Sequence, residues 1–191
     1  MLWNKCKAFN YLENILRLFK EGKHMQTLID VILSRHSVRK FTGALISEED
    51  LNIIVKAGMA APSAMNIQPW SFIVITDKLI LNNLCKALPY AKMLDTAGAA
   101  IVVCGDSKEA NWVVDCAAAT ENILLAAHSL GYGAVWTAVY KDESRIEPVR
   151  KECKIPNDII PLNVIPIGVP IEKNVKPIDK YKENKIHKNI W

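Results

Sequence analysis

Hydrophobic and polar positions alternate between helical and strand spacing from Thr27 to Gly168. Apolar residues three and four positions apart indicate amphipathic helices, whereas short β-branched or aromatic runs indicate strands. Helices are predicted over 28–35, from Ser47 to near Pro62, and over 78–88, 109–130 and 142–153. Strands are predicted over 72–76, 99–104, 134–138 and 161–168.

Several local signals refine these boundaries. Ser47-Glu-Glu-Asp50 is typical of a capping box at a helix start, and Gly131 is predicted to be the left-handed residue that ends helix 109–130. Pro148 is expected to start a new turn within 142–153, because proline removes a hydrogen bond from a helix interior. The continuous apolar run 99–104 favours a strand covered on both faces.

The two ends differ from this central part, which we assign to one domain over 26–170. Residues 1–25 form an amphipathic pattern, in which Leu12, Ile15, Leu16 and Phe19 recur at helical spacing beside lysines. We expect a peripheral helix, although Met25 could also begin a self-sufficient chain. The tail 171–191 has little periodicity and ends on an apolar residue, so we expect it to wrap around another surface, such as a second subunit.

Composition narrows the class of protein. The 191 residues are 50% hydrophobic and 23% charged, which suits one folded domain with a full core. A net charge of +4 favours anionic ligands without indicating nucleic acid. The five cysteines are odd in number and lack C-x-x-C spacing, so neither a disulfide framework nor a zinc site is expected. We therefore expect the protein to be located in the reducing cytoplasm. The most apolar run, 112–130, contains charged residues and is predicted to be a buried helix rather than a membrane span.

Common catalytic motifs do not occur. The four histidines form no H-x-x-x-H pair, there is no G-x-S-x-G elbow, and His128 is expected to be a hydrogen-bonded core histidine. Gly131-Tyr-Gly133-Ala-Val-Trp136 begins like a dinucleotide fingerprint, but it follows a helix and precedes a strand, which is the reverse of that motif. Hydrolase and Rossmann-type functions are therefore disfavoured.

The segment from Ser34 to Phe41 combines four cationic or imidazole side chains with two hydroxyls at a predicted helix end. A phosphate monoester is bound by such a mixture, because guanidinium groups donate bidentate charge-assisted hydrogen bonds and hydroxyls fill the remaining lone pairs. The alternative is a solvated basic helix end that complements the helix dipole.

The loop from Ala60 to Trp70 contains two prolines that restrict its backbone, and it presents Ser63, Asn66 and Gln68. Amide side chains both donate and accept hydrogen bonds, which suits the edge of a heterocycle such as the pyrimidine ring of a flavin. A polar turn before the next strand is the alternative.

Together these segments resemble the nitroreductase family of FMN-dependent oxidoreductases. The markers are R-H-S-V-R-K-F at 35–41, A-P-S-A-M-N-I-Q-P-W at 61–70 and K-M-L-D at 92–95, followed by 117–136 and by I-P-I-G at 165–168. The resemblance implies an α+β fold, an α-β-α sandwich whose mostly antiparallel sheet is flanked by helices, in an intertwined homodimer. Helix 109–130 would be the central dimer helix, and the tail 171–191 would embrace the partner.

The resemblance also implies FMN sites at the dimer interface. Arg35, His36 and Ser37 would contact the phosphate and ribityl chain, and Arg39 would lie near flavin N1 and O2. The loop supplied by the other subunit would contribute Pro62, Ser63, Ala64, Asn66 and Gln68. Main-chain N–H groups at Trp136, Thr137 and Ala138 would face flavin N5. Lys92 would lie near the ring or the nicotinamide, and Lys176 or Lys180 would close over the phosphate.

The activity implied is NAD(P)H-dependent reduction of a small-molecule electron acceptor, such as a nitroaromatic or a quinone, by a ping-pong mechanism. The cofactor would carry the chemistry, which agrees with a sequence that lacks a catalytic triad. Two alternatives remain open: a flavin carrier or sensor of the same fold, and a specialised reductase of the dehalogenase or enone type.

Overall fold

The computed structural model describes residues 27–172 and 175–191, and the boundary between two compact units falls at Leu33 and Ser34. The predicted amphipathic segment 1–25 lies outside the described residues. Helix α2 (Leu28–Ser34) begins with reciprocal capping: the Thr27 N–H donates to Asp30 Oδ2 at 3.0 Å, and the Asp30 N–H donates to Thr27 Oγ1 at 3.2 Å. The helix predicted over 28–35 is therefore present and ends one residue earlier.

The unit from Ser34 onward alternates helices with strands, as the hydrophobic pattern predicts. Its helices are α3 (Glu48–Met59), α4 (Lys78–Ala87), α5 (Trp112–Ser129) and α6 (Glu143–Cys153), with short 3₁₀ turns η1 (Ala64–Asn66), η2 (Lys92–Asp95) and η3 (Glu183–Lys185). Its strands are β1 (Trp70–Ile75), β2 (Ala99–Asp106), β3 (Gly133–Ala134), β4 (Thr137–Ala138) and β5 (Ile159–Gly168).

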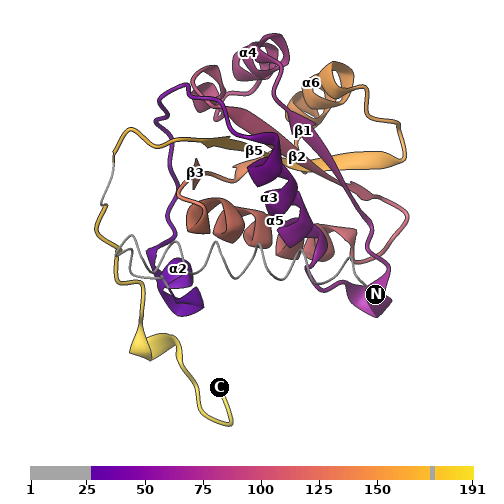
Figure 1. Ribbon diagram of the computed structural model, residues 1–191. Helices are drawn as coiled ribbons and strands as arrows, with labels where there is room; N and C mark the ends of the chain where they lie inside the picture. The colour runs from indigo at the N-terminus through magenta and orange to yellow at the C-terminus, as the bar shows by residue number, and fades with distance from the viewer. Residues whose placement is uncertain (1–26, 173–174) are drawn as a thin grey trace, which may run out of the picture. The chain divides into compact units, whose positions relative to one another are not determined.

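These strands form one antiparallel sheet in the order β1-β2-β5-β3, with β4 also paired to β5. Helices α3 and α5 cover one face of the sheet, and α4 and α6 cover the other (Figure 1). The α+β sandwich and its antiparallel sheet are confirmed, although the sequence pattern alone does not determine strand direction.

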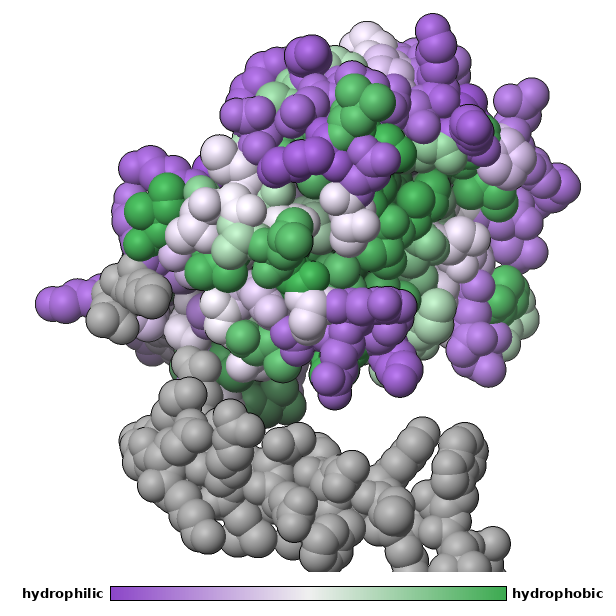
Figure 2. All heavy atoms as spheres, turned by 45° about the horizontal axis from the view of Figure 1, so that its top comes forward, coloured by the Kyte–Doolittle hydropathy of each residue, from purple (hydrophilic) through white to green (hydrophobic). Residues whose placement is uncertain are grey.

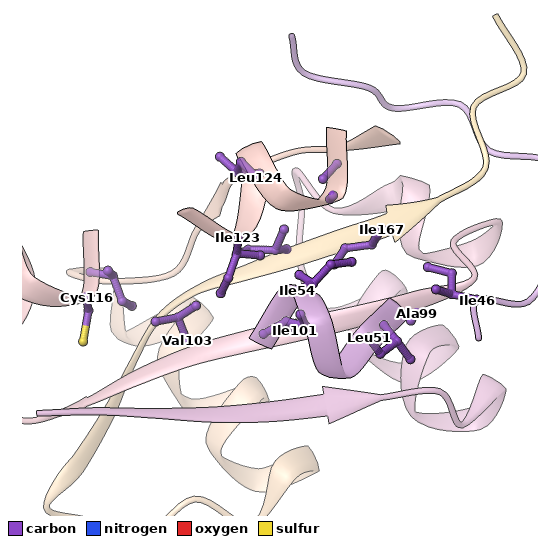
Figure 3. Close-up of a cluster of buried hydrophobic side chains, with 14 of the residues drawn as sticks. Ile46, Leu51, Ile54, Ala99, Ile101, Val103, Cys116, Ile123, Leu124 and Ile167 are labelled. Carbon is purple, nitrogen blue, oxygen red and sulfur yellow. The ribbon is translucent and has the colours of Figure 1, made fainter. Parts of the chain in front are cut away.

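Strand β2 is the centre of the hydrophobic core because both of its faces are buried. Ala99, Ile101 and Val103 pack against α3 and α5, and the side chains of this cluster point toward one another in Figure 3. The alternating residues Ala100, Val102 and Cys104 pack against α4 and α6. The two-sided burial expected for 99–104 is therefore present.

Helix ends follow the predicted chemistry. Ser47 Oγ accepts the Asp50 N–H at 3.1 Å at the start of α3. Asp50 does not complete a capping box, because its Oδ2 accepts the hydroxyl of Tyr132 at 2.6 Å instead. Gly131 follows α5 with a φ of 84°, which is the left-handed conformation predicted there.

Two predicted elements differ in the structure. The predicted strand 134–138 is divided into β3 and β4, which pair with different parts of β5. Pro148 lies inside a continuous α6 rather than at the start of a new turn. Buried Ile146 and Val149 anchor the helix on both sides of the proline, so packing outweighs the single hydrogen bond that the proline removes.

Strand β1 lies at one edge of the sheet. Its side chain Val74 is 41% exposed, and with Leu45 and Leu51 it helps line a groove of about 450 Å³. Figure 2 shows apolar side chains spread among hydrophilic ones across one face of the molecule. Among residues 27–172 and 175–191, no strand pairs with the outer edge of β1.

Candidate functional site

Residues 37–42 run beside β3 and the end of β5. The Val38 N–H donates to the Ala134 carbonyl at 3.0 Å, and the Thr42 N–H donates to the Val169 carbonyl at 2.9 Å. Gly133 permits this close approach, because a Cβ at that position would lie 2.6 Å from Cβ of Val38. The structure therefore brings the basic segment next to Gly133 and Ala134, which lie about a hundred residues later in the sequence and shortly before the predicted stretch 136–138.

Helix α5 holds the start of the basic segment. The Arg35 Nε lies 3.1 Å from Glu121 Oε1, and Ser34 Oγ lies 2.8 Å from His128 Nε2. His36 Nδ1 lies 3.0 Å from the Ser34 carbonyl, and the His36 ring meets the His128 ring edge-on at a centroid distance of 5.9 Å. His128 is hydrogen-bonded as predicted, but it is only partly buried and is therefore not the core histidine that was expected.

A pocket of about 280 Å³ opens beside this segment. Its walls are His36, Ser37, Val38, Arg39, Lys40, Glu172 and Val175. Lys40 is paired with Glu172 at 3.0 Å, whereas Arg39 has no ion-pair partner among the described residues and is exposed. Within the described ranges, Arg39 also makes no ion pair with the acidic residues Glu48 and Glu49 at the start of α3. An exposed, unpaired guanidinium on a pocket wall suits an anionic ligand.

The second predicted segment, 62–68, is a compact loop at the other end of α5. The Ala64 N–H donates to Asp115 Oδ1 at 3.1 Å, and the Gln68 N–H donates to Ser63 Oγ at 3.0 Å. Met65, Asn66 and Gln68 all have positive φ angles, between 50° and 57°. This backbone turns Asn66 and Gln68 toward solvent, where they are exposed. Pro62 is exposed as well.

The two predicted segments do not meet within one chain. Asp115 holds the loop and His128 holds the basic segment, and thirteen residues of helix correspond to about 20 Å along its axis. A single ligand contacted by both ends would have to bridge most of the helix.

The stretch 136–138 follows β3 directly. The Thr137 hydroxyl donates to the Val164 carbonyl at 2.6 Å, and Ala138 pairs with Asn163 in β5. Trp136 is 37% exposed, so its ring is accessible. This stretch is held by β5 while its outer side remains open.

The residues before Lys92 lie near the stretch 136–138, but the Lys92 ammonium is bound elsewhere. Residues 88–91 line a narrow pocket together with Thr137 and Ala138. The Lys92 ammonium itself donates to the Cys85 carbonyl at 2.8 Å and to the Lys86 carbonyl at 3.4 Å, at the end of α4. The structure therefore does not place the Lys92 ammonium with Arg39.

The tail lysines lie on an exposed, largely irregular stretch. Val175 lines the pocket of Arg39, and Lys176 is its neighbour in the chain. Lys180 is four residues farther along and is also exposed. The tail leaves β5 beside the basic segment, because the Ile171 N–H donates to the Lys40 carbonyl at 3.2 Å.

Sequence reasoning missed three polar contacts of the site. Asp115 and Glu121 were recognised only as charges in an apolar helix, although such residues are candidates for holding neighbouring segments. The third is a cation–π contact, in which the Arg145 guanidinium lies 5.0 Å from the centroid of the Tyr90 ring. No local spacing in the sequence predicts this last pair.

Two of the described cysteines, Cys104 and Cys116, are buried. Burial raises the pKa of Cys104 and of Cys116 to about 12, so both stay protonated and unreactive near neutral pH. Residues 27–172 and 175–191 contain no cluster of three His, Cys, Asp or Glu side chains that could hold a metal ion. Within the same ranges, no helix is long and apolar enough to cross a membrane.

Comparison with known proteins identifies the class. The sequence model described as the Nitroreductase family matches residues 32–89 and 81–169. This chain is 41% identical over 174 residues to an Archaeoglobus fulgidus protein named "Putative NADH dehydrogenase/NAD(P)H nitroreductase", covering 87% of this chain and 100% of that protein. The chain therefore belongs to the nitroreductase family, a family of oxidoreductases.

Solved structures agree with this assignment. A Parabacteroides distasonis protein with the same name has a TM-score of 0.82 and 48% identity, covering 86% of this chain and 98% of its own. A Clostridium difficile protein described as an FMN-dependent nitroreductase has a TM-score of 0.80 and 31% identity, covering 85% of this chain and 99% of its own. The nitroreductase fold inferred from the sequence markers is confirmed.

The environment of His128 generates a prediction about pH. Burial, and then the positive charges of His36 and Arg35, lower the pKa of His128 below its usual 6.5. The unfolded chain therefore binds a proton at a higher pH than the folded chain does, and stability is lost as the pH falls below about 6.5. We expect urea unfolding in phosphate-free buffer to show a smaller loss between pH 7.5 and pH 5 for His128→Gln than for the wild type, because glutamine keeps a hydrogen-bonding group for Ser34. Equal losses in the two proteins would contradict this assignment.

Proposed function

We propose that this protein is an FMN-dependent NAD(P)H oxidoreductase that acts as a homodimer on small electron acceptors such as nitroaromatics or quinones. The observation that carries the proposal is the pairing of the basic segment 35–39 with Ala134, two residues before the stretch 136–138, beside an open pocket lined by 36–40. Membership in the nitroreductase family supports it, as does the description of the Clostridium difficile relative as FMN-dependent.

The residues on the pocket wall suit the phosphate end of FMN. Arg35 approaches Glu121 through its Nε at 3.1 Å, and its Nη groups make no hydrogen bond within the described ranges, so they could donate to a phosphate as a fork. Arg35 itself does not line the pocket, but the residues that follow it, His36 and Ser37, place an imidazole and a hydroxyl on the pocket wall. Lys176 or Lys180 would supply a further cation from the tail.

The proposed dimer follows from the separation along α5. Because the loop 62–68 lies about 20 Å from the basic segment of its own chain, its polar side chains would meet an FMN bound there more readily from a second copy. Helix α5 has an outward apolar surface for such a contact, since Val114 is 69% exposed and Ala117 and Ala118 are half-buried. The tail 171–191 would then extend onto the partner.

Bound FMN would supply hydride acceptance from NAD(P)H and electron transfer to the acceptor. The chain would supply binding and electrostatics. Arg39 would stabilise the negative charge that develops on the flavin ring upon reduction, and main-chain N–H groups at 137–138 would orient the ring edge. This reaction would require no side-chain nucleophile.

The direct test is spectroscopic. We expect the purified protein to be yellow, to lose its flavin absorbance when NADH or NADPH is added under anaerobic conditions, and to regain that absorbance when a nitroaromatic or a quinone follows. A protein that binds FMN tightly but is reduced by neither nicotinamide would be a flavin carrier, and the enzymatic proposal would fail.

Arg39 provides a second prediction. Arg39→Gln removes the charge but keeps a hydrogen-bond donor, so we expect FMN to remain bound while its midpoint potential falls and its reduction by NAD(P)H slows. A potential titration and stopped-flow reduction measure the two effects. An unchanged potential would show that Arg39 does not act on the reduced ring.

A heterodimer tests the shared site. Arg35→Ala and Asn66→Ala each remove a contact proposed for a different subunit of the same site. When the two variants are co-expressed with different tags and the mixed dimer is isolated, one site keeps both contacts and the other loses both. We expect the mixed dimer to bind one equivalent of FMN with the wild-type affinity, whereas sites formed within one chain would show only weakened binding.

A further inference from the structure

Glu121 and His128 are two polar side chains of α5 that contact the basic segment directly. Glu121 lies seven residues, or two helical turns, before His128, so both side chains project from one face of the helix toward 34–36. His128 contacts the side-chain hydroxyl of Ser34, whereas Glu121 contacts the Arg35 guanidinium at Nε. The family assignment gives Glu121 no role.

We propose that Glu121 is a positioning residue, which holds Arg35 by Nε so that the two Nη groups face the FMN phosphate. This inference rests on the proposed function. The contact at Nε is the feature that supports it, because a carboxylate bound across the Nη groups would occupy the fork that a phosphate needs. The Nη groups carry no other hydrogen bond or ion pair in the described residues.

Exposure argues against a mainly stabilising role for this pair. The side chain of Glu121 is 49% exposed and that of Arg35 is 20% exposed. An ion pair so open to water contributes little to folding, since solvent screens the charges. The same contact still restricts the torsions of a long side chain, and an arginine that is already ordered loses less conformational entropy when its ligand binds.

The carboxylate has two opposite effects on a phosphate. Its ion pair with Nε restricts the Arg35 side chain and favours binding, whereas its negative charge repels the phosphate. Substitution by glutamine keeps an oxygen that can accept the Nε hydrogen and removes the charge, while substitution by alanine removes both. The two variants therefore separate positioning from charge.

The experiment measures FMN and riboflavin affinities of the full-length protein, after removal and replacement of its flavin, by fluorescence titration. We expect Glu121→Ala to weaken FMN binding about two- to fivefold, the size of effect typical of an exposed ion pair, with riboflavin binding unchanged. Glu121→Gln is expected to bind FMN at least as tightly as the wild type does. Rescue by glutamine is the signature of positioning.

Glu147→Ala is a matched control. Glu147 makes the same kind of contact, with Arg150 Nε at 3.4 Å on α6, and its side chain is 66% exposed. Its removal is expected to leave the affinities for both flavins unchanged. A similar loss of FMN affinity in this control would show that the effect of Glu121→Ala is a general response to losing a surface carboxylate.

Arg35→Ala separates failure of this inference from failure of the proposed function. If Arg35→Ala weakens FMN much more than riboflavin while Glu121→Ala binds FMN like the wild type, the phosphate site stands and the positioning role is wrong. If Arg35→Ala weakens FMN and riboflavin equally, Arg35 does not bind the phosphate and both proposals fall. Equal weakening of FMN by Glu121→Ala and Glu121→Gln would also overturn positioning.

Discussion

The packing of helix α5 against the sheet is the interaction on which the rest of the structure depends. Cys116, Ile123 and Ala127 are fully buried on the helix face that meets the core. Two linked hydrogen bonds cross the same interface: Asn163 Nδ2 donates to Thr120 Oγ1 at 2.9 Å, and the Thr120 hydroxyl donates to the Cys116 carbonyl at 2.8 Å. A hydrogen-bonded pair inside an apolar interface has one favourable alignment, which opposes sliding of the helix along the sheet.

The alignment of α5 in turn sets the positions of the candidate site. Asp115 holds the loop 62–68, and Glu121 and His128 hold the basic segment. A shift of one residue along the helix would turn each of these side chains by about 100° and break all three contacts. Core packing and the placement of the candidate site residues are therefore not separable in this fold.

Much of the fold could be predicted because its determinants are local. Ser47 and Gly131 mark helix ends by chemistry that acts within a few residues, and the unbroken apolar run of β2 reports burial on both faces. The division of 134–138 into β3 and β4 could not be predicted, because it depends on how each piece meets β5. Pro148 shows the same limit, since burial on both sides of it keeps α6 continuous.

The candidate site also has a part that could be predicted from the sequence and a part that could not. The segments around Arg35 and Asn66 stand out from composition and from proline spacing, and the flavin roles assigned to their residues remain predictions. The partners of these segments are not visible in the sequence, because Glu121 is 86 residues from Arg35 and no periodicity connects them. The position of Lys92 also illustrates this point, since its ammonium is bound by carbonyl groups at the end of α4.

The edge position of β1 affects the tendency of the protein to aggregate. The strand Trp-Ser-Phe-Ile-Val-Ile carries no charged residue, and its outer backbone groups are not paired with another strand in the described part of the chain. Uncharged edge strands of this kind recruit strands from other chains, which is a common route to aggregation. For a newly made chain whose β1 edge stays uncovered, the rate of encounter with other such edges rises with protein concentration, and so does the tendency to aggregate.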